Sequence, residues 1–478
     1  MNTTPPRPNP GRRDFLRHSA AMVGAGFSGL GLLSGVRGAA ATPGAAGAAP
    51  PIEEYGPLVV DPNRTIDLPE GFSYRVFSTW SQEMDDGLVV PAKHDGMAAF
   101  PVDDRHCLLI RNHEINTQMP VRYGAFGWQN ERLGRIDSER LYDPGTSTGR
   151  PSPGGTTSIL YDLHDRRPVR QWLSLAGTGY NCSGGPTPWG SWLSCEEWTQ
   201  RADAHHARDH GYVFEVPATT TMELAPPTPI TAMGRFVHEA VACAPGGDVL
   251  YLTEDRGDGS LYRFLPTTPG NLQAGGRLQA LVVNDRPSMD TRNWTDDGTA
   301  NLIPGAPMPV SWIDLSEIDA PQDDLRYRAF ASGAARFARG EGIWHGGDQV
   351  YFACTTGGKA QIGQIFSYRP SPYEGTEREA ASPATLELFI EPNDATLIEM
   401  ADNLTVAPNG DLFICEDGPD TNGMTRVTPD GHLERFAINR ANTSELAGPC
   451  FSPDGSTLFV NIQNPGATLA ITGPWQAT

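Results

Sequence analysis

The chain has 478 residues, enough for one very large hydrophobic core or two to three ordinary ones. Its hydrophobic fraction is only 38%, and its 53 glycines and 42 prolines favour an all-β structure with many turns over helical packing. The formal net charge of −21 argues against a nucleic-acid-binding surface, which needs a basic stripe, and is compatible with bound metal cations.

The first segment is predicted to be an export signal. The charged stretch GRRDFLRHSA (11–20) precedes a short apolar, glycine-rich run, AMVGAGFSGLGLLSGV (21–36). This order is typical of a cleaved secretory signal and not of a membrane span, and Arg12-Arg13 resembles a twin-arginine signal. We therefore expect residues 1–41 to be recognised by the twin-arginine translocase. The mature protein is then periplasmic or extracellular, without a stable membrane anchor.

A low-complexity stretch that begins TPGAAGAAPP follows the signal. Its composition cannot bury enough apolar surface to fold, so residues 42–60 are expected to form a disordered linker. The remaining chain, residues 61–478, is expected to be a single domain. We also expect a monomer, because no apolar interface patch is evident.

A short unit recurs along this domain: a turn signal, an apolar strand, polar residues and a second strand. In chain order its six copies fall at 101–114, 186–217, 244–266, 345–370, 407–429 and 452–466. Paired strands that cannot bury their faces alone are typical of a β-propeller. We predict six blades with long loop insertions at 115–155 and 267–335, the last blade being completed by FSYRVFS (72–78). A seventh blade within 267–335 is the alternative.

The second copy poses a choice between a disulfide and a metal site. Cys182 and Cys195 lie in NCSGGPTPWGSWLSCEEW (181–198), where Cys182 comes eight residues before the turn at Gly190. Hairpin pairing across that turn carries Cys195 past the level of Cys182. The disulfide is therefore disfavoured, and Cys182 is interpreted as a metal ligand.

Carboxylates occupy the same place in four other copies. Asp95, Glu239 and Asp402 also precede their turns by eight residues, and Glu341 does so by six. In a propeller, the first strand of each blade lines the axis, so these side chains would converge at one mouth of the channel. Like charges so close together would raise one another's pKa unless cations compensate them. The alternative is that each is an ordinary turn-capping residue.

Further acidic residues end the second strand of several copies. These possible additional ligands are Glu196, Glu197, Glu254, Asp255, Glu416 and Asp417. Alternation along a strand directs only one of each neighbouring pair toward the axis. Arg339 stands two residues before Glu341 and either binds a phosphate or carboxylate group or forms a structural salt bridge with Glu341.

Several of these stretches together resemble the PhoX alkaline phosphatase family, over roughly residues 65–470. The stretches are DGMAAF (95–100), RNHE (111–114), NCSGGPTPWGSWLSCEEW (181–198), GRFVHEA (234–240), ARGEG (338–342) and DNLTVAPNGDLFICEDG (402–418). The resemblance implies a six-bladed propeller with an axial cluster of ferric iron and calcium. It also implies an exported hydrolase that releases phosphate from small-molecule phosphomonoesters.

The resemblance also implies roles for single residues. Cys182 corresponds to an iron ligand, and Glu197 and Glu239 correspond to ligands of iron or calcium. Glu341 and Asp402 correspond to calcium-side carboxylates, whereas Asp95 is assigned as a metal ligand from the repeat alone. Arg339 matches the arginine of the phosphate pocket, and Lys359 in TTGGKAQIG is aligned with the family's lysine near the phosphate.

The resemblance leads us to expect metal-assisted hydrolysis without a side-chain nucleophile, which fits the absence of a GxSxG motif. Two alternatives remain. One is another calcium-dependent propeller hydrolase, such as a lactonase or a phytase-like esterase, whose site is usually built from oxygen ligands alone. The other is a non-catalytic exported propeller that binds a partner through its long loops.

Overall fold

The computed structural model describes residues 55–294 and 302–475. Within them the chain forms strands β1 to β26, six 3₁₀ turns and one α-helix, α2 (Leu325–Ala331). These described residues belong to one compact unit. The predicted signal at 1–41 and most of the predicted linker lie outside the described residues.

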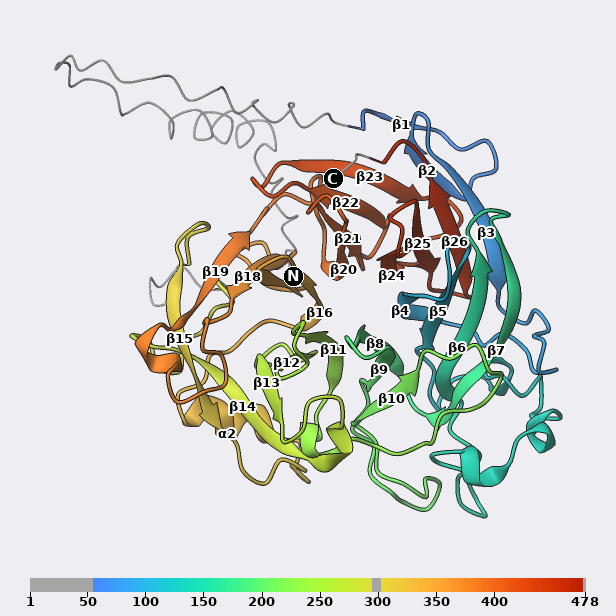
Figure 1. Ribbon diagram of the computed structural model, residues 1–478, viewed down its shortest axis with the longest axis horizontal. Coiled ribbons are helices and arrows are strands. Elements are labelled where there is room, and N and C mark those ends of the chain that lie inside the picture. The colour runs from blue at the N-terminus through green and yellow to red at the C-terminus, as the bar shows by residue number, and fades with distance from the viewer. Residues whose placement is uncertain (1–54, 295–301, 476–478) are drawn as a thin grey trace, which may run out of the picture. The chain divides into compact units, whose positions relative to one another are not determined.

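Six inner strands surround the central axis of this unit (Figure 1). They are β4 (His94–Pro101), β8 (Asn181–Pro186), β11 (His238–Cys243), β16 (Gly340–Gly346), β20 (Ala401–Val406) and β24 (Leu446–Phe451). Each inner strand contacts the next one in the chain, and β24 contacts β4, so the ring is closed. The predicted propeller-like, all-β fold is therefore confirmed.

Three inner strands begin separate antiparallel sheets that run outward. The first sheet orders β4, β5 (His106–His113), β6 (Gly154–Asp162) and β7 (Arg167–Thr178). The second orders β8, β9 (Ser191–Glu196) and β10 (Val213–Pro217). The third orders β24, β25 (Thr457–Ile462), β26 (Ala467–Thr472) and β3 (Ser73–Thr79). The early strand β3 thus completes the last sheet, as expected, by pairing with β26.

A fourth sheet starts at β20. It continues through β21 (Leu412–Glu416), β22 (Gly423–Val427), β23 (Leu433–Asn439), β2 (Ile66–Pro69) and β1 (Leu58–Val59). Tyr55, just before β1, packs edge-on against Phe72, Phe436 and Trp475, with ring centroids 5.0, 5.8 and 6.1 Å away. Packed structure therefore begins within the range that the sequence suggested was linker.

The fifth sheet has nine strands and contains two inner strands. From β11 it passes through β12 (Leu250–Glu254), β13 (Tyr262–Pro266), β14 (Gly276–Val283), β15 (Met308–Asp314), β19 (Ala384–Ile390), β18 (Gln364–Arg369) and β17 (Gln349–Cys354) to β16. Strand β15 pairs with both β14 and β19 and so joins the two halves at their outer edges. It comes from the 267–335 insertion, where the alternative prediction placed a seventh blade. The described hydrogen-bonded sheets therefore number five, not six.

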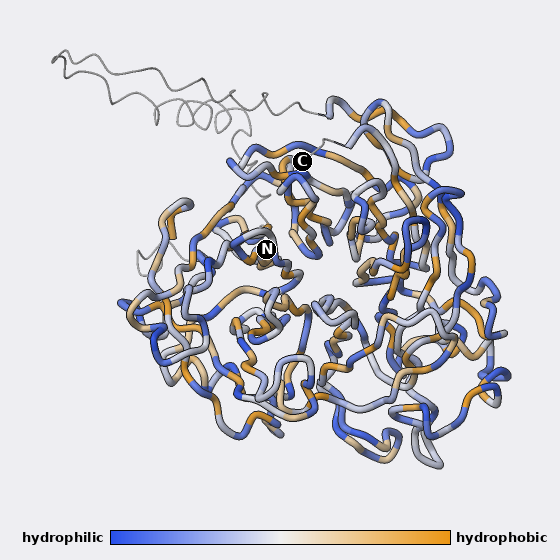
Figure 2. The backbone as a smooth tube through the Cα atoms, viewed as in Figure 1, coloured by the Kyte–Doolittle hydropathy of each residue, from blue (hydrophilic) through white to orange (hydrophobic). Residues whose placement is uncertain are grey.

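The core lies between neighbouring sheets. Tyr251, Phe352 and Phe366, for example, belong to one buried cluster that links the two halves of the nine-stranded sheet. Figure 2 shows the apolar positions along the strands and many hydrophilic residues in the outer loops. No helix in residues 55–294 and 302–475 is long and apolar enough to cross a membrane.

Candidate metal centre

All six inner strands carry the same irregularity near their first residues. In each, the pairing with the second strand shifts register at the same place, as a β-bulge does when it inserts an extra residue and re-aims a side chain. The residues at these shifts are Asp95, Cys182, Glu239, Glu341, Asp402 and Gly448. The five residues that the spacing singled out therefore occupy one structural position, and glycine occupies it in the sixth strand.

Glycines allow neighbouring bulges to touch backbone to backbone. A Cβ atom at Gly96 would lie 2.5 Å from Cα of Ser183, and one at Gly342 would lie 2.8 Å from Cα of Asn403. A side chain at either position would push adjacent inner strands apart. The close approach of the bulges keeps the carboxylates and the thiol near one another.

The structure brings eight acidic or thiol side chains into three groups. In each group, one ligand atom from every member lies within 4.8 Å of the others. The groups are Cys182 with Glu197 and Glu239, Glu239 with Glu341 and Asp402, and Asp95 with Glu114 and Glu445. Because Glu239 belongs to two groups, the first two form one continuous set of donors.

The electrostatics of these groups call for compensating positive charge. Burial raises the pKa of Glu239 well above its ordinary value, and the charges of Asp402 and Asp95 raise it further. Burial and the charge of Asp417 raise the pKa of Asp402 to about 8. Without cations these carboxylates cannot all be ionised near neutral pH. Carboxylate oxygens suit hard cations such as calcium or ferric iron, and a thiolate adds a preference for a transition metal.

The second strands supply one acidic residue of each neighbouring pair to the axis. Glu197 joins Cys182, whereas Glu196 points away and accepts hydrogen bonds from Nδ1 of His210 at 2.6 Å and from the amide of Gly179 at 2.8 Å. The prediction that Glu196 is a further ligand is therefore not supported, because its carboxylate oxygens accept hydrogen bonds from neighbouring loops.

The other two pairs behave in the same way. Glu254 accepts from the Tyr262 hydroxyl at 2.8 Å, and Glu416 accepts from the amide of Glu399 at 3.0 Å, so both are occupied within their own sheets. Asp255 instead binds Arg339. Asp417 lines a cavity beside the third group, which is described below. Asp255 and Asp417 remain candidates for the centre, and Glu254 and Glu416 do not.

Arg339 lies at the edge of the second group. Its guanidinium donates to both carboxylate oxygens of Asp255, at 2.8 and 3.0 Å, and to Oε1 of Glu341 at 2.7 Å. The salt bridge considered from the sequence is therefore present. The side chain is still 29% exposed, so a bound anion can reach it as well.

A cavity of about 500 Å³ opens beside the third group. Its lining includes Lys93, Glu114, Tyr180, Asp417, Glu445 and Gln463. Lys93 Nζ lies 3.9 Å from Glu114 and donates to Gln463, which in turn donates to Asp95 at 3.0 Å. Lys93 therefore stands beside the acidic residues at the mouth of the ring.

Lys359 does not line this cavity. It is exposed on the loop between β17 and β18, and its backbone amide donates to Glu391 at 3.3 Å. The alignment of Lys359 with a phosphate-binding lysine is thus at odds with its place in the fold.

Two acidic residues of the centre were not singled out from the sequence. Glu114 follows the second strand of its hairpin just as Glu197, Asp255 and Asp417 do, so the repeat contained a signal for it. Glu445 directly precedes β24 and has no counterpart in most of the other hairpins. Only the closed ring brings it to Asp95 and Glu114.

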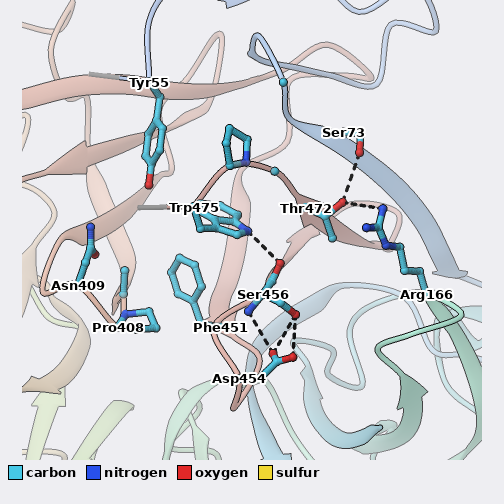
Figure 3. A pocket seen from close by; sticks show the side chains of 15 residues that line it. Tyr55, Ser73, Arg166, Pro408, Asn409, Phe451, Asp454, Ser456, Thr472 and Trp475 are labelled. Carbon is cyan, nitrogen blue, oxygen red and sulfur yellow. Dashed lines mark hydrogen bonds between the residues drawn. The ribbon is translucent and has the colours of Figure 1, made fainter. Parts of the chain in front are cut away.

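A second cavity, of about 700 Å³, lies at the opposite ends of the β20–β21 and β24–β25 hairpins (Figure 3). Tyr55, Phe451 and Trp475 line it together with Asp454 and Ser456. Asp454 is already engaged by Ser456 within the turn, at 2.9 Å. No residue of the three acidic groups lines this cavity, so it is separate from the candidate centre.

Comparison with known proteins points to one family. The family model for alkaline phosphatase PhoX matches residues 53–466. The structure of Pseudomonas fluorescens PhoX in complex with vanadate, a transition state analogue, aligns with a TM-score of 0.62 and 20% identity over 86% of this chain and 96% of that one. No curated protein matches the sequence.

Other solved structures match more weakly. The gluconolactonase XC5397 from Xanthomonas campestris aligns with a TM-score of 0.41 and 12% identity, covering 88% of this chain and 99% of that one. Virginiamycin B lyase from Staphylococcus aureus aligns with a TM-score of 0.33 and 11% identity, covering 84% and 99%.

Proposed function

Since the chain belongs to the PhoX alkaline phosphatase family, it is a metal-dependent phosphatase that hydrolyses phosphomonoesters, and we propose that an iron and calcium cluster at the mouth of the ring serves this reaction. The observation that carries the proposal is the thiol of Cys182 among carboxylates. A site for calcium alone needs only oxygen donors, whereas a thiolate favours a transition metal.

The three groups suggest how the cations would be shared. Cys182 and Glu197 would hold iron, Glu341 and Asp402 would hold calcium, and Glu239, which belongs to both groups, would contribute to this set. The group of Asp95, Glu114 and Glu445 would hold a further calcium ion. When bound, these cations would stabilise negative charge on the phosphoryl oxygens and activate the attacking nucleophile, so no side-chain nucleophile is required.

The chain's own residues would position the ester. Asp255 and Glu341 fix the guanidinium of Arg339 in one orientation, which leaves it ready to donate to two phosphoryl oxygens. Lys93 takes the role that the sequence resemblance assigned to Lys359, because Lys93 lines the cavity. Its ammonium group would add a second positive charge near the phosphoryl group.

We also propose the finer architecture and the route of export. The two halves of the nine-stranded sheet each start at an inner strand, which supports counting them as two blades and the molecule as a six-bladed propeller. Residues 1–41 would be a twin-arginine signal, residues 42–60 a linker and residues 61–478 the catalytic domain. The enzyme would act as a monomer in the periplasm or outside the cell on small phosphate esters.

Metal analysis combined with an activity assay tests the proposal. Purified protein should contain both iron and calcium and should hydrolyse p-nitrophenyl phosphate. Cys182→Ala should lose the iron and at least about 100-fold in kcat, since a charge-stabilising group of the site is lost. Cys195→Ala is the matched control, because Cys195 is also a buried thiol of this hairpin but belongs to none of the three groups.

Two results would count against the proposal. Calcium as the sole metal, with full activity in Cys182→Ala, would contradict the iron assignment. A fully metal-loaded protein that hydrolyses no phosphomonoester would contradict the role of the cluster in catalysis.

A further inference from the structure

The residue two positions before the bulge has an uncommon backbone conformation in four inner-strand segments. Its φ angle is +50° at Lys93 and +55° at Tyr180, Arg339 and Met400. This left-handed conformation costs free energy for residues other than glycine and persists where the surrounding structure enforces it, often at functional sites. Three of the four residues carry long polar side chains, and two of those are Lys93 and Arg339.

Tyr180 is held in this conformation by the strands that carry the acidic residues. Its amide donates to the carbonyl of Ile115 at 2.8 Å, and its carbonyl accepts from the amide of Glu197 at 2.9 Å. Ile115 directly follows Glu114, so both hydrogen bonds tie Tyr180 to the ends of second strands. The half-buried side chain lines the mouth cavity together with Lys93.

The lining of this cavity combines three carboxylates and one cation with several neutral polar side chains, among them Asn442, Thr443 and Ser444. Glu114, Asp417 and Glu445 line it, whereas Lys93 is the cation among its lining residues. A phosphoryl group needs hydrogen-bond donors around its oxygens, and a phenol hydroxyl supplies one without adding charge. The Tyr180 hydroxyl forms a side-chain hydrogen bond with Glu114, another residue of the cavity wall, and this contact places the hydroxyl at that wall.

We infer that Tyr180 is a substrate contact, whose hydroxyl donates a hydrogen bond to a phosphoryl oxygen of an ester held between it and Lys93. This inference rests on the proposed phosphatase function. Two features of the described residues support it: the left-handed backbone position that Tyr180 shares with Lys93 and Arg339, and the place of Tyr180 in the cavity wall.

Tyr180→Phe tests the contact, because it removes the hydroxyl and keeps the ring. In metal-loaded enzyme we expect kcat/KM for p-nitrophenyl phosphate to fall about 10- to 100-fold, as for the loss of one donor to an anionic group. The inhibition constant of vanadate should rise by a similar factor. Iron and calcium contents should equal those of the wild type. If the hydroxyl instead supported the structure or oriented a metal ligand, the metal contents would fall.

Tyr212→Phe is the matched control. The Tyr212 hydroxyl donates to Asp319 at 2.6 Å in the same part of the ring, and Tyr212 does not line the cavity. Its loss should leave kcat/KM and vanadate inhibition within about twofold of the wild type.

Three outcomes would overturn the inference. The first is a Tyr180→Phe enzyme with unchanged kcat/KM and vanadate inhibition. The second is a loss of activity that parallels a loss of metal, since the hydroxyl would then serve Glu114. The third, a wild-type enzyme that is inactive when fully loaded, would overturn the phosphatase function and this inference together, whereas the first two leave the phosphatase function standing.

Discussion

Lys93 and Arg339 occupy the same backbone position in two different hairpins, two residues before Asp95 and Glu341. Both have positive φ, and both side chains lie beside carboxylates of the candidate centre. Cations placed this way can neutralise part of the acidic cluster and bind a phosphoryl group. The two residues therefore act as the positively charged part of an otherwise acidic mouth.

Substitution of each lysine tests whether Lys93 or Lys359 binds the phosphoryl group. Lys93→Met keeps the length of the side chain and removes its charge, so kcat/KM for p-nitrophenyl phosphate should fall about 10- to 100-fold. Lys359→Met should stay within about twofold of the wild type, because Lys359 is exposed and does not line the cavity. Steady-state kinetics on both variants, with metal contents measured in parallel, provide the check. The reverse pattern would restore Lys359 as the phosphate-binding lysine.

The spacing within the repeat predicts some residues of the candidate centre and not others. The spacing of eight residues to the turn identified Asp95, Cys182, Glu239 and Asp402, because each lies at the same bulge of the same kind of hairpin. The pattern could not tell which member of Glu196-Glu197 faces the axis. Glu196 points away from the axis because it accepts hydrogen bonds from His210 and from the amide of Gly179.

At the level of elements, the bulges of neighbouring inner strands are packed against one another. Gly96 faces the bulge of β8, and Gly342 faces that of β20, in both cases backbone to backbone. The metal centre therefore depends on glycine at positions that are not ligands.

Gly96→Ala should destabilise the fold because its Cβ would lie 2.5 Å from the Cα of Ser183, and backbone cannot move aside cheaply. We expect the free energy of unfolding to fall by about 1–3 kcal/mol, as for overpacking of a tight site. Gly134→Ala, in a 3₁₀ turn where an added Cβ meets nothing within 4 Å, should change it by less than about 0.5 kcal/mol. Denaturant unfolding of both variants measures the difference, and equal effects would refute the packing argument.

The strands within the insertion 267–335 could not be predicted from the sequence. The length of the insertion suggested either a loop or an additional blade. In the structure it contributes β14, β15 and α2. Strand β15 pairs with both β14 and β19 and so joins the two halves into one sheet. Covering two open edges with one strand satisfies their backbone groups, and no local sequence pattern distinguishes this from a separate blade.

For the whole molecule, the acidic centre makes stability depend on pH and on metal. Burial and neighbouring charge raise the pKa of Asp402 to about 8 in the folded, metal-free protein, above the value of about 4 in an unfolded chain. Such a carboxyl group binds its proton more tightly when folded. The folded state therefore loses stability as pH rises from about 4 through 8.

His210 acts in the same direction. Burial alone would lower its pKa, but the charges of Glu196 and Asp143 raise it to about 9, above its unfolded value of about 6.5. Its stabilising contribution is complete below pH 6.5 and is lost as pH rises through 9.

Calorimetry of chelator-treated protein should therefore show a lower melting temperature at pH 9 than at pH 5. Reloading with iron and calcium should remove most of this decline, because the cations stabilise the ionised carboxylates. A metal-free protein whose stability rises between pH 5 and 9 would contradict the assignment of these buried acids to a cation site.

The strand repeat, the propeller-like class of fold, the five residues at the bulges and the absence of a Cys182–Cys195 disulfide could all be predicted from the sequence. These follow from short-range geometry, because residues within one hairpin keep a constant spacing wherever the hairpin is placed. Only the tertiary structure decided that β15 fuses two halves into one sheet, that Glu114 and Glu445 meet Asp95, and that Lys93 and Tyr180 reach the mouth while Lys359 does not. Those relations depend on closure of the ring, which brings together segments up to several hundred residues apart and leaves no trace in local spacing.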